Sequence, residues 1–341
     1  EELLLPRLLE SVNSQDYPRG LFKTYVIADN CTDNTAGVAA ANGTTVLERT
    51  DPGHMGKGYA IKWALEEIKT DGCDAVFIVD ADSIMDKYVL KNLDKDLSRG
   101  KEIIQCYNGI ENPDDSWFTR LLEVSRAISN FIYHPAKQKL GLSSSLMGNG
   151  MCFSKTALSK HEWDSFSVGE DWEYYAKLMH KDEIVAYNMN ARVYHRESST
   201  LKQATSQRMR WSSGRFAVAW NHGLGLFFKG IAELNLRKID ASLPLILPNP
   251  SLGINVSAAM FLISIILHVK FDDTLLILWF SALILLQASV FMIGIFYTKH
   301  RFKNFLSIFI APLFLIWKMG IDILSFLGLG RKNWVRTGRR L

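Results

Sequence analysis

The chain has 341 residues, with 39 Lys and Arg against 35 Asp and Glu, and its net charge of +4 is too small to indicate a nucleic-acid partner. No stripe of basic and aromatic residues points to one either, so we expect no nucleic acid. The mean hydropathy of +0.02 averages two unlike parts. Most charges lie in residues 1–240, whereas 243–327 is dominated by Leu, Ile, Phe, Ala and Val. The sequence therefore predicts a charged domain followed by a membrane region.

The α/β pattern starts at the first residues. Helix and strand signals alternate in the order helix 4–12, strand 23–28, an Ala-rich helix after Thr35, strand 44–48, helix 56–68 and strand 75–79. Such alternation predicts an open α/β sheet, and ligands bind such sheets beyond the carboxyl ends of the strands. Asp29 and Asp80-Ala81-Asp82 come at two such ends. Because the chain begins abruptly, we expect that the first strand of the domain is missing.

The cysteines carry no metal or disulfide pattern. They lie far apart with no CxxC spacing, at Cys31, Cys73, Cys106 and Cys152. This fits neither a disulfide framework nor a zinc site and is typical of a reducing cytosol. We expect ordinary core or surface thiols.

Two apolar segments, 252–269 and 274–297, are each close to the roughly 20 residues that cross a bilayer. A short acidic link joins them, and basic residues flank the pair on both outer sides: Lys229, Arg237, Lys238, Lys299, Arg301 and Lys303. The positive-inside rule predicts a transmembrane hairpin with the charged domain in the cytosol, at the plasma membrane if the cell is bacterial. The alternative is a buried hairpin in the core of a soluble protein.

The last apolar segment, 305–327, differs from these two. It carries Lys318 and Asp322, which would each cost about 2.5–3.5 kcal/mol at a bilayer centre, and Pro312 interrupts it. Crossing would also leave a basic tail outside. We therefore expect an interfacial or re-entrant helix followed by a basic cytosolic tail.

Two groups of residues suit the binding of a diphosphate. Asp80 and Asp82 can meet a divalent cation, because Mg²⁺ and Mn²⁺ take oxygen ligands, commonly one or two carboxylates plus substrate phosphates. The alternative is an Asp-x-Asp triplet in an ordinary loop. Gly56-Lys57-Gly58 at a helix start offers N–H groups and an ammonium to an anion. The alternative there is a solvated lysine after a flexible turn.

Two predicted helices carry further candidates. Glu170 and Asp171 lie in a first turn, where one carboxylate can serve as general base for an acceptor hydroxyl, or both can simply favour the helix dipole. Gln207, Arg210 and Trp211 share a later helix. Arg suits phosphate recognition and Trp offers a flat apolar face to a sugar ring, although an ordinary amphipathic helix explains the same pattern.

Taken in order, these motifs resemble those of the inverting family-2 glycosyltransferases, and most closely the synthases of cellulose, hyaluronan, chitin and poly-N-acetylglucosamine. The resemblance covers the chain and rests on Asp29 with Asp33, Gly56-Lys57-Gly58, Asp80-Ala81-Asp82, Gly148-Asn149-Gly150, Gly169-Glu170-Asp171, Gln207-Arg208-Met209-Arg210-Trp211 and Trp334-Val335-Arg336-Thr337-Gly338-Arg339. The combination is specific, whereas no single motif is. One departure is Gly169, where the family usually has Thr.

The resemblance implies a GT-A fold for residues 1–240, a Rossmann-like mixed sheet flanked by helices, with the membrane region at 241–341. It implies transfer of a sugar from a nucleotide donor, usually UDP-linked, to a glycan or lipid-linked acceptor near membrane lipid, with Mg²⁺ or Mn²⁺. Asp171 would be the catalytic base. The donor-binding residues would be Asp29 (at the uracil), Lys57, Asp80, Asp82 (also at the metal), Gln207 and Arg210. The acceptor-binding residues would be Gly148, Asn149, Gly150, Glu170 and Trp211, and the gating residues Trp334 and Thr337.

Competing interpretations remain at this stage. The Gln-x-x-Arg-Trp motif favours extension of a β-linked polysaccharide, while the rival enzyme moves one sugar to a lipid or lipid-linked acceptor. A partner subunit or a homo-oligomer would complete a translocation channel. A membrane sensor of nucleotide sugars is the rival from another class, and a Rossmann dehydrogenase is set aside because no GxGxxG follows a strand. For His195 we expect a structural role rather than a metal or phosphate contact.

Overall fold

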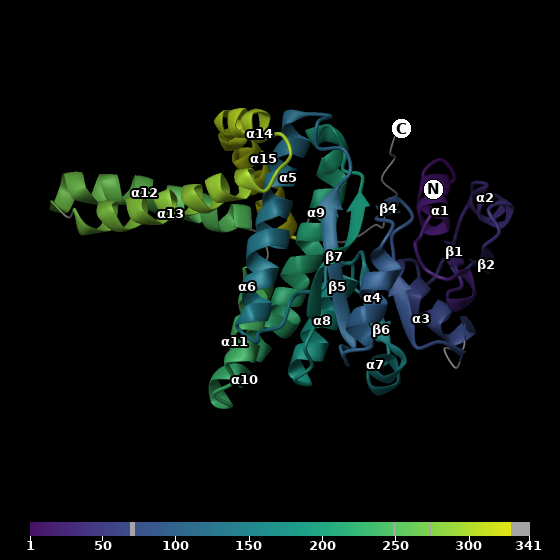
Figure 1. Ribbon diagram of the computed structural model, residues 1–341. Helices are drawn as coiled ribbons and strands as arrows, with labels where there is room; N and C mark the ends of the chain where they lie inside the picture. The colour runs from purple at the N-terminus through teal and green to yellow at the C-terminus, as the bar shows by residue number, and fades with distance from the viewer. Residues whose placement is uncertain (69–71, 248–249, 273, 329–341) are drawn as a thin grey trace.

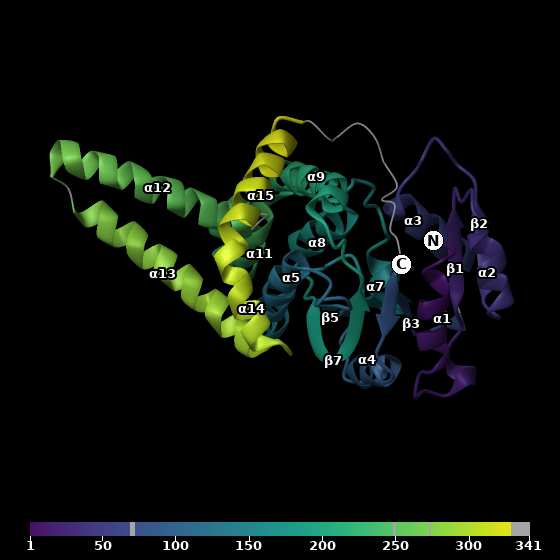
Figure 2. The same ribbon diagram turned by 90° about the horizontal axis from the view of Figure 1, so that it is seen from above.

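The computed structural model describes residues 1–68, 72–247, 250–272 and 274–328. It has a body of sheet and helices, from which a pair of long helices projects to one side (Figures 1 and 2). The projecting pair is α12 (Pro250–Phe271) and α13 (Leu275–Phe296). The amino-terminal elements lie at the opposite side of the body.

The amino-terminal elements form a small parallel unit. Strands β1 (Tyr25–Asp29) and β2 (Thr45–Arg49) pair in parallel, and helices α1 (Leu5–Asn13) and α2 (Thr35–Ala41) accompany them. This confirms the expected alternation of helix and strand. The pair is a separate two-stranded sheet, so the described residues do not join it to the main sheet by hydrogen bonds.

The main sheet is mixed, as expected. Its five strands lie in the order β3 (Ala75–Ile78), β6 (Met151–Ser154), β5 (Ile103–Ile110), β7 (Ala186–His195) and β4 (Ser83–Met85). The central pair, β5 and β7, is parallel, and the other pairings are antiparallel. Both central strands therefore point their carboxyl ends at the same edge of the sheet.

Each face of the sheet has its own apolar core. Side chains alternate along a strand, so Ile103 and Phe153 point to one face and their neighbours Ile104 and Cys152 to the other. The remaining helices of the body are α3 (Lys57–Ile68), α4 (Val89–Leu97), α5 (Trp117–Ala127), α6 (His134–Lys139), α7 (Lys155–Lys160), α8 (Glu170–His180), α9 (Leu201–Val218), α10 (Leu224–Ala232) and α11 (Leu236–Ile246). The first core lies under α8, α10 and α11, and the second under α1 and α4.

The cysteines match the prediction of ordinary thiols. None of the four forms a disulfide: Cys106 and Cys152 are buried, Cys73 is partly exposed and Cys31 is exposed. Burial raises the pKa of the Cys152 thiol to about 12, so it stays neutral in the core.

The carboxyl-terminal helices close the body beside the projecting pair. Helices α14 (Arg301–Ser307) and α15 (Ala311–Phe326) run across the base of α12 and α13 rather than along them (Figure 2). Three segments in the described residues are long and apolar enough to cross a membrane: Ser251–Phe271, Leu275–Phe296 and Arg301–Phe326. Few residues of the first two are buried by protein: 11% of the apolar window in the first and 0% in the second.

The two charges in the last segment face the protein. Lys318 and Asp322 are buried, bond to each other, and both bond to the hydroxyl of Ser212 on α9, at 2.8 Å and 2.9 Å. The free-energy cost of removing these two charges from water is therefore offset by their hydrogen bonds to each other and to Ser212. The base of the hairpin is held by close packing, since a methyl group on Gly294 would lie 2.5 Å from Ile128 Cγ1.

Candidate active site

Lys57 connects the donor-side residues. Its ammonium, at the start of α3, donates to Asp80 Oδ1 and to the carbonyl of Gly148, and lies 4.0 Å from Glu170 Oε1. Burial alone would lower the pKa of Lys57, but the carboxylates of Asp80 and Glu170 raise it above its ordinary value. The lysine is therefore a positive charge held by two hydrogen bonds, with its side chain still 32% exposed, and its contact with a diphosphate stays a prediction.

The glycines beside Lys57 have separate reasons to be there. Gly56 has φ +134°, a backbone conformation that other residues rarely adopt. A methyl group on Gly58 would lie 2.0 Å from the carbonyl oxygen of Ser165, so only glycine lets α3 approach that segment. Together they fix the direction in which the Lys57 side chain leaves its helix.

The Gly-Asn-Gly segment before β6 is the floor of the site. Gly148 and Gly150 have φ of +77° and +70°. Between them Asn149 is buried; its side-chain oxygen accepts from the N–H of Asp80 at 3.0 Å and its amide donates to Ser83 Oγ at 2.9 Å. Asn149 therefore holds both ends of the loop that carries Asp80 and Asp82. Because the Asn149 side chain is used in this way, the predicted acceptor contact at this residue would have to be made by its backbone.

Glu170 and Asp171 begin α8 next to this floor. A methyl group on Gly148 would lie 3.0 Å from Asp171 Oδ2. Burial, reinforced by the charge of Asp171, raises the pKa of Glu170 to about 8. Burial also raises the pKa of Asp171, while Lys57 and Arg215 oppose that rise. Lys57 and Arg215 thus favour the charged form of Asp171.

Helix α9 brings the Gln-x-x-Arg-Trp residues to the same place. Gln207 is buried, and its Oε1 has no hydrogen-bond partner among the described residues. Burial lowers the pKa of Arg210, and the carboxyl of Glu170 opposes this lowering. The Arg210 guanidinium therefore lies within electrostatic reach of the start of α8. The Arg208 guanidinium lies 4.6 Å from the centre of the Trp211 ring. Arg210 is thus placed near Glu170, whereas the roles of Gln207 and Trp211 stay predictions.

The departure at Gly169 has a local explanation. Helices α8 and α9 cross where a methyl group on Gly169 would lie 3.4 Å from the carbonyl carbon of Gly214, and one on Gly214 would lie 2.9 Å from the nitrogen of Gly169. The two glycines allow the backbones to touch. This crossing sets the distance between the Asp171 end of α8 and the Arg210 face of α9.

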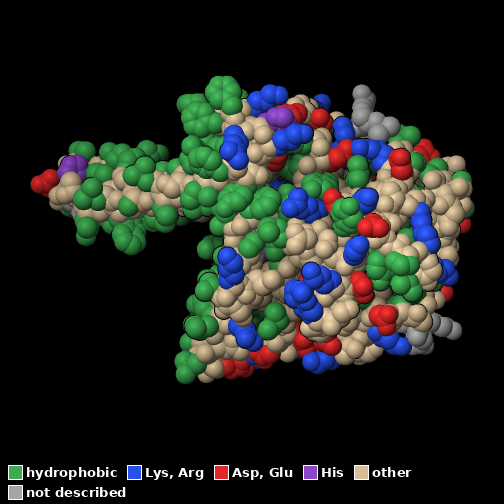
Figure 3. Space-filling view, viewed as in Figure 1, with side chains coloured by type: hydrophobic (Ala, Val, Ile, Leu, Met, Phe, Trp, Pro, Cys, Tyr) green, Lys and Arg blue, Asp and Glu red, His purple; other side chains and the backbone are tan. Residues whose placement is uncertain are grey.

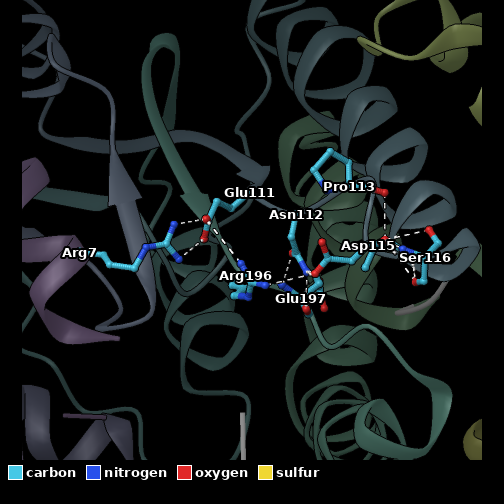
Figure 4. A network of polar contacts seen from close by, with 9 residues as sticks. Arg7, Glu111, Asn112, Pro113, Asp115, Ser116, Arg196 and Glu197 are labelled. Atoms are coloured by element: carbon cyan, nitrogen blue, oxygen red, sulfur yellow. Dashed lines mark hydrogen bonds and ion pairs between the residues drawn. The ribbon is translucent and has the colours of Figure 1, made fainter. Parts of the chain in front are cut away.

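A polar network joins α1 to the segments that follow β5 and β7 (Figure 4), and Glu197 extends it to Arg208 of α9. Arg7 of α1 bonds to Glu111, and Asn112 accepts from the N–H of Glu197 at 2.9 Å. The buried Glu197 carboxylate then accepts from Arg208 at 2.6 Å and lies 3.1 Å from His195 Nε2. Although burial would raise the pKa of Glu197, Arg208 and His195 hold it far below its ordinary value.

This network accounts for His195. The ring is buried, and its other nitrogen, Nδ1, lies 2.9 Å from Asn108 Oδ1. Both ring nitrogens are therefore used within the protein, and the expected structural role is confirmed.

The amino-terminal unit contributes Asp29, at the end of β1. Its Oδ1 accepts from Arg49 at 2.6 Å and from Asn30 at 3.0 Å, and Arg49 also bonds to Asp51 at 2.9 Å. The structure thus places Asp29 in an ion-pair group with Arg49 and Asp51. Contact with a nucleobase stays a prediction.

Two arginines were missed from the sequence. Arg126 of α5 and Arg215 of α9 both lie within electrostatic reach of Asp171, which opposes the lowering of their pKa values by burial. Arg215 also lies over the Trp172 ring, with its guanidinium 4.6 Å from the ring centre. No motif marks either residue, because their elements come together only in the fold. Trp334 and Thr337, the expected gating residues, lie outside the described residues.

The site meets the requirements of a divalent cation only with help from a substrate. Among the described residues no group of three or more His, Cys, Asp or Glu side chains is arranged to hold a metal. Asp80 is engaged by Lys57, and Asp82, the expected metal ligand, lies on the same loop held by Asn149. Mg²⁺ and Mn²⁺ are commonly held by one or two carboxylates plus substrate phosphates, so this donor set fits.

Residues 1–214 match the family model described as Glycosyltransferase like family 2, which covers more than half of the chain. The chain therefore belongs to the family-2 glycosyltransferases and has the GT-A fold.

Individual relatives are distant. Over 226 residues the chain is 25% identical to the beta-monoglucosyldiacylglycerol synthase of Nostoc sp. (strain PCC 7120 / SAG 25.82 / UTEX 2576). The match covers 63% of this chain and 47% of that protein. The chain therefore spans about half the length of this curated relative.

Among solved structures, S. aureus TarS 1-349 in complex with UDP-GlcNAc is 15% identical, covers 96% of this chain and 87% of its own, and has a TM-score of 0.49. Mycobacterium tuberculosis glucosyl-3-phosphoglycerate synthase, in complex with Mn²⁺, UDP-glucose and phosphoglyceric acid, is 15% identical over 61% and 74%, with a TM-score of 0.42.

Proposed function

We propose that this enzyme transfers a sugar from a UDP-linked donor, with inversion, to a hydroxyl of an acceptor held at the membrane. The observation that carries the proposal is the convergence of Lys57, Asp80, Gly148 and Asp171 on one place. A fixed ammonium there suits a diphosphate, and an ionisable carboxyl beside it suits an attacking hydroxyl.

Asp171 is the proposed general base. Two adjacent buried carboxyls do not both ionise readily, and Glu170, with a pKa of about 8, keeps its proton at neutral pH. Lys57 and Arg215 favour the charged form of Asp171. Asp171 then accepts the proton of the acceptor hydroxyl as the oxygen attacks the anomeric carbon, on the side opposite the departing diphosphate.

The donor half of the site is built from Lys57, Asp80, Asp82, Gln207 and Arg210. Lys57 and Arg210 supply positive charge to the diphosphate, and the unpartnered oxygen of Gln207 supplies an acceptor to a donor hydroxyl or N–H group. Mg²⁺ or Mn²⁺ held at Asp82 would stabilise negative charge on the leaving group. Asp29 is the candidate contact for the uracil ring.

The acceptor is proposed to approach from the membrane side. Trp211 offers an aromatic face for a sugar ring, and the backbone of Gly148 and Gly150 allows close approach. Apolar helices α12 and α13 are the proposed spans, with residues 1–240 as the cytosolic catalytic domain. Helices α14 and α15 are the proposed interfacial segment, which their course across the base of the hairpin supports.

Two acceptor classes follow from different observations. The Gln-x-x-Arg-Trp motif favours extension of a β-linked polysaccharide or glycan, which stays the first proposal. Transfer of one sugar to a lipid is the second, because the curated relative is named a monoglucosyldiacylglycerol synthase. Electrophoresis and lipid chromatography of radiolabelled products separate them, since a ladder supports the polymer and one labelled lipid supports single transfer.

Replacement of Asp171 tests the chemistry. Membranes containing the full chain are incubated with a panel of UDP-sugars and Mn²⁺ or Mg²⁺, and released UDP is measured. We expect Asp171→Asn to lower kcat by about 10²–10⁴-fold, the usual contribution of a general base, with little change in donor affinity. Undiminished turnover in this variant would disprove the role. Donor binding without UDP release by the unaltered protein would support a sensor instead.

A further inference from the structure

Helices α10 and α11 carry an apolar surface that the protein itself does not cover. On α10 and the turn before it, Trp220, Leu224, Phe228 and Ile231 recur every three or four residues, so they share one face of the helix. Trp220 is 77% exposed and Phe228 is 64% exposed. The face is about 16 Å long at 1.5 Å per residue.

The second helix extends this surface. Leu236 and Leu243 of α11 also share one face and are exposed, as is Leu247 just after the helix. The helices pack tightly against each other, since a methyl group on Gly230 would lie 2.8 Å from the nitrogen of Ile239. The connection is fixed by Asn235, whose side chain caps α11 and whose amide donates to Asp182 of the body at 2.9 Å. The apolar surface is therefore presented by a rigid pair and not by a loose loop.

The opposite faces of both helices are used for folding. Leu226 on α10 and Ala241 and Leu245 on α11 belong to the main apolar core with α8. Lys238 is buried between Asp182 and Glu233, to which it donates. The exposed leucines and aromatics thus lie on the side that the core does not need.

The position of this surface identifies what covers it. Helix α11 ends only a few residues before α12 begins, so the surface is continuous in the chain with a proposed membrane span. In Figure 3 apolar side chains, with some Lys and Arg among them, lie along the edge of the body below the hairpin, on the side from which α12 and α13 project, where Figure 1 places α10 and α11. A bilayer that contains the hairpin lies against this side of the body.

We propose that the α10–α11 pair lies in the interface of the bilayer and seats the catalytic body against the lipid. Its apolar face enters the boundary between headgroups and acyl chains, and Arg237, exposed next to Leu236, meets lipid phosphates. Trp220 occupies the level at which tryptophan is favoured in membranes. Because α10 continues from α9, this contact fixes the height of Arg210 and Trp211 above the bilayer. The proposal rests on α12 and α13 being membrane spans.

Nitroxide labels on single cysteines test the depth of the surface. Cys31 and Cys73 are first replaced by Ser, while the buried Cys106 and Cys152 stay. Labels are placed at Phe228→Cys and Leu243→Cys, with Leu285→Cys on α13 and Leu21→Cys in the amino-terminal unit as references; all four native side chains are exposed. The full chain is reconstituted in vesicles of phosphatidylcholine and phosphatidylglycerol, and collision with oxygen and with a water-soluble nickel complex is measured by electron paramagnetic resonance.

We expect labels at 228 and 243 to collide preferentially with oxygen, as at 285, and the label at 21 to collide with the nickel complex. Nickel access at 228 and 243 equal to that at 21 overturns the seating while leaving the spans intact. Protection from both reagents also overturns it, in favour of a protein cover such as a second copy. If 285 is reached by nickel too, the membrane assignment itself has failed. Retained UDP release by each labelled protein shows that it is folded.

Discussion

Asp171 Oδ2 lies next to Gly148: a methyl group added to the glycine would lie 3.0 Å from this oxygen. The carbonyl of that same glycine accepts from Lys57, which also bonds to Asp80. One residue without a side chain therefore separates the proposed base from the proposed diphosphate site. The two halves of the reaction meet at this glycine.

Replacement of Gly148 by Ala therefore lowers activity for a local reason. The added methyl presses on Asp171, and the residue must hold φ of +77°. Gly100 has φ of +80° with open space around it, so Gly100→Ala carries the backbone cost alone. We expect both variants to lose about 1–2 kcal/mol of unfolding free energy, measured by urea denaturation. Only Gly148→Ala is expected to lose kcat, and equal kinetic losses in the two variants would contradict this role.

The ionisation of Glu170 sets an alkaline limit to donor binding. At neutral pH the carboxyl is protonated, because burial and Asp171 raise its pKa to about 8. As the pH rises through that value, it becomes a second negative charge beside the diphosphate site. We expect KM for the UDP-sugar to rise above about pH 8 in the unaltered enzyme, and Glu170→Gln to abolish the rise while retaining activity. A pH profile of KM that is the same in both proteins would disprove the assignment.

Asn149 is predicted to act through the aspartate loop. Asn149→Ala removes its hydrogen bonds to the Asp80 N–H and to Ser83. Because Asp82 then loses its fixed position, we expect weaker donor and Mn²⁺ affinity by calorimetry, with a larger effect on KM than on kcat. Asn42→Ala is the control, since that side chain bonds to the carbonyl of Val38 at 2.8 Å on α2. Unchanged affinity in Asn149→Ala would show that the loop holds itself.

Glu197 is predicted to position α9 and not to touch substrate. Glu197→Ala leaves the buried Arg208 without its carboxylate, and breaking such a pair costs about 3–5 kcal/mol. The exposed pair of Lys62 with Glu66, at 3.8 Å, supplies the control, because Lys62→Ala should cost at most about 0.5 kcal/mol. Thermal unfolding and UDP release measure the two effects. If Glu197→Ala is as stable as Lys62→Ala, the Glu197–Arg208 pair does not hold α9 in position.

Local motifs made much of the fold predictable. Alternating helix and strand signals placed α1, β1, β2, α3 and β3, since each is coded within a few residues. The pairing of β5 with β7 could not be predicted, because it joins segments about eighty residues apart whose register depends on the whole core. The separation of β1 and β2 from the main sheet was likewise not visible in the sequence.

The sequence indicated the candidate residues of the site, but not the contacts between them. Lys57, Asp80, Gly148 and Asp171 were candidates by their motifs, yet their meeting depends on α3, β3, the Gly-Asn-Gly segment and α8 arriving together. Asn149 was expected to face an acceptor, whereas its side chain is used by the aspartate loop. Arg126 and Arg215 carried no signal, because a charge on a helix has no meaning until its neighbours are known. The sequence suggested that Lys318 and Asp322 would be costly in lipid, whereas in the structure both side chains face the protein and bond to Ser212.

The most direct test is the structure of the Asp171→Asn variant with Mn²⁺ and a UDP-sugar that the unaltered enzyme uses. We expect the variant to bind donor with little change in affinity and to turn it over about 10²–10⁴-fold more slowly. We predict that the diphosphate contacts Lys57, that the cation lies at Asp82, and that the anomeric carbon is open toward residue 171. A donor bound away from Lys57, or a sugar whose attacked face points away from residue 171, would contradict the mechanism.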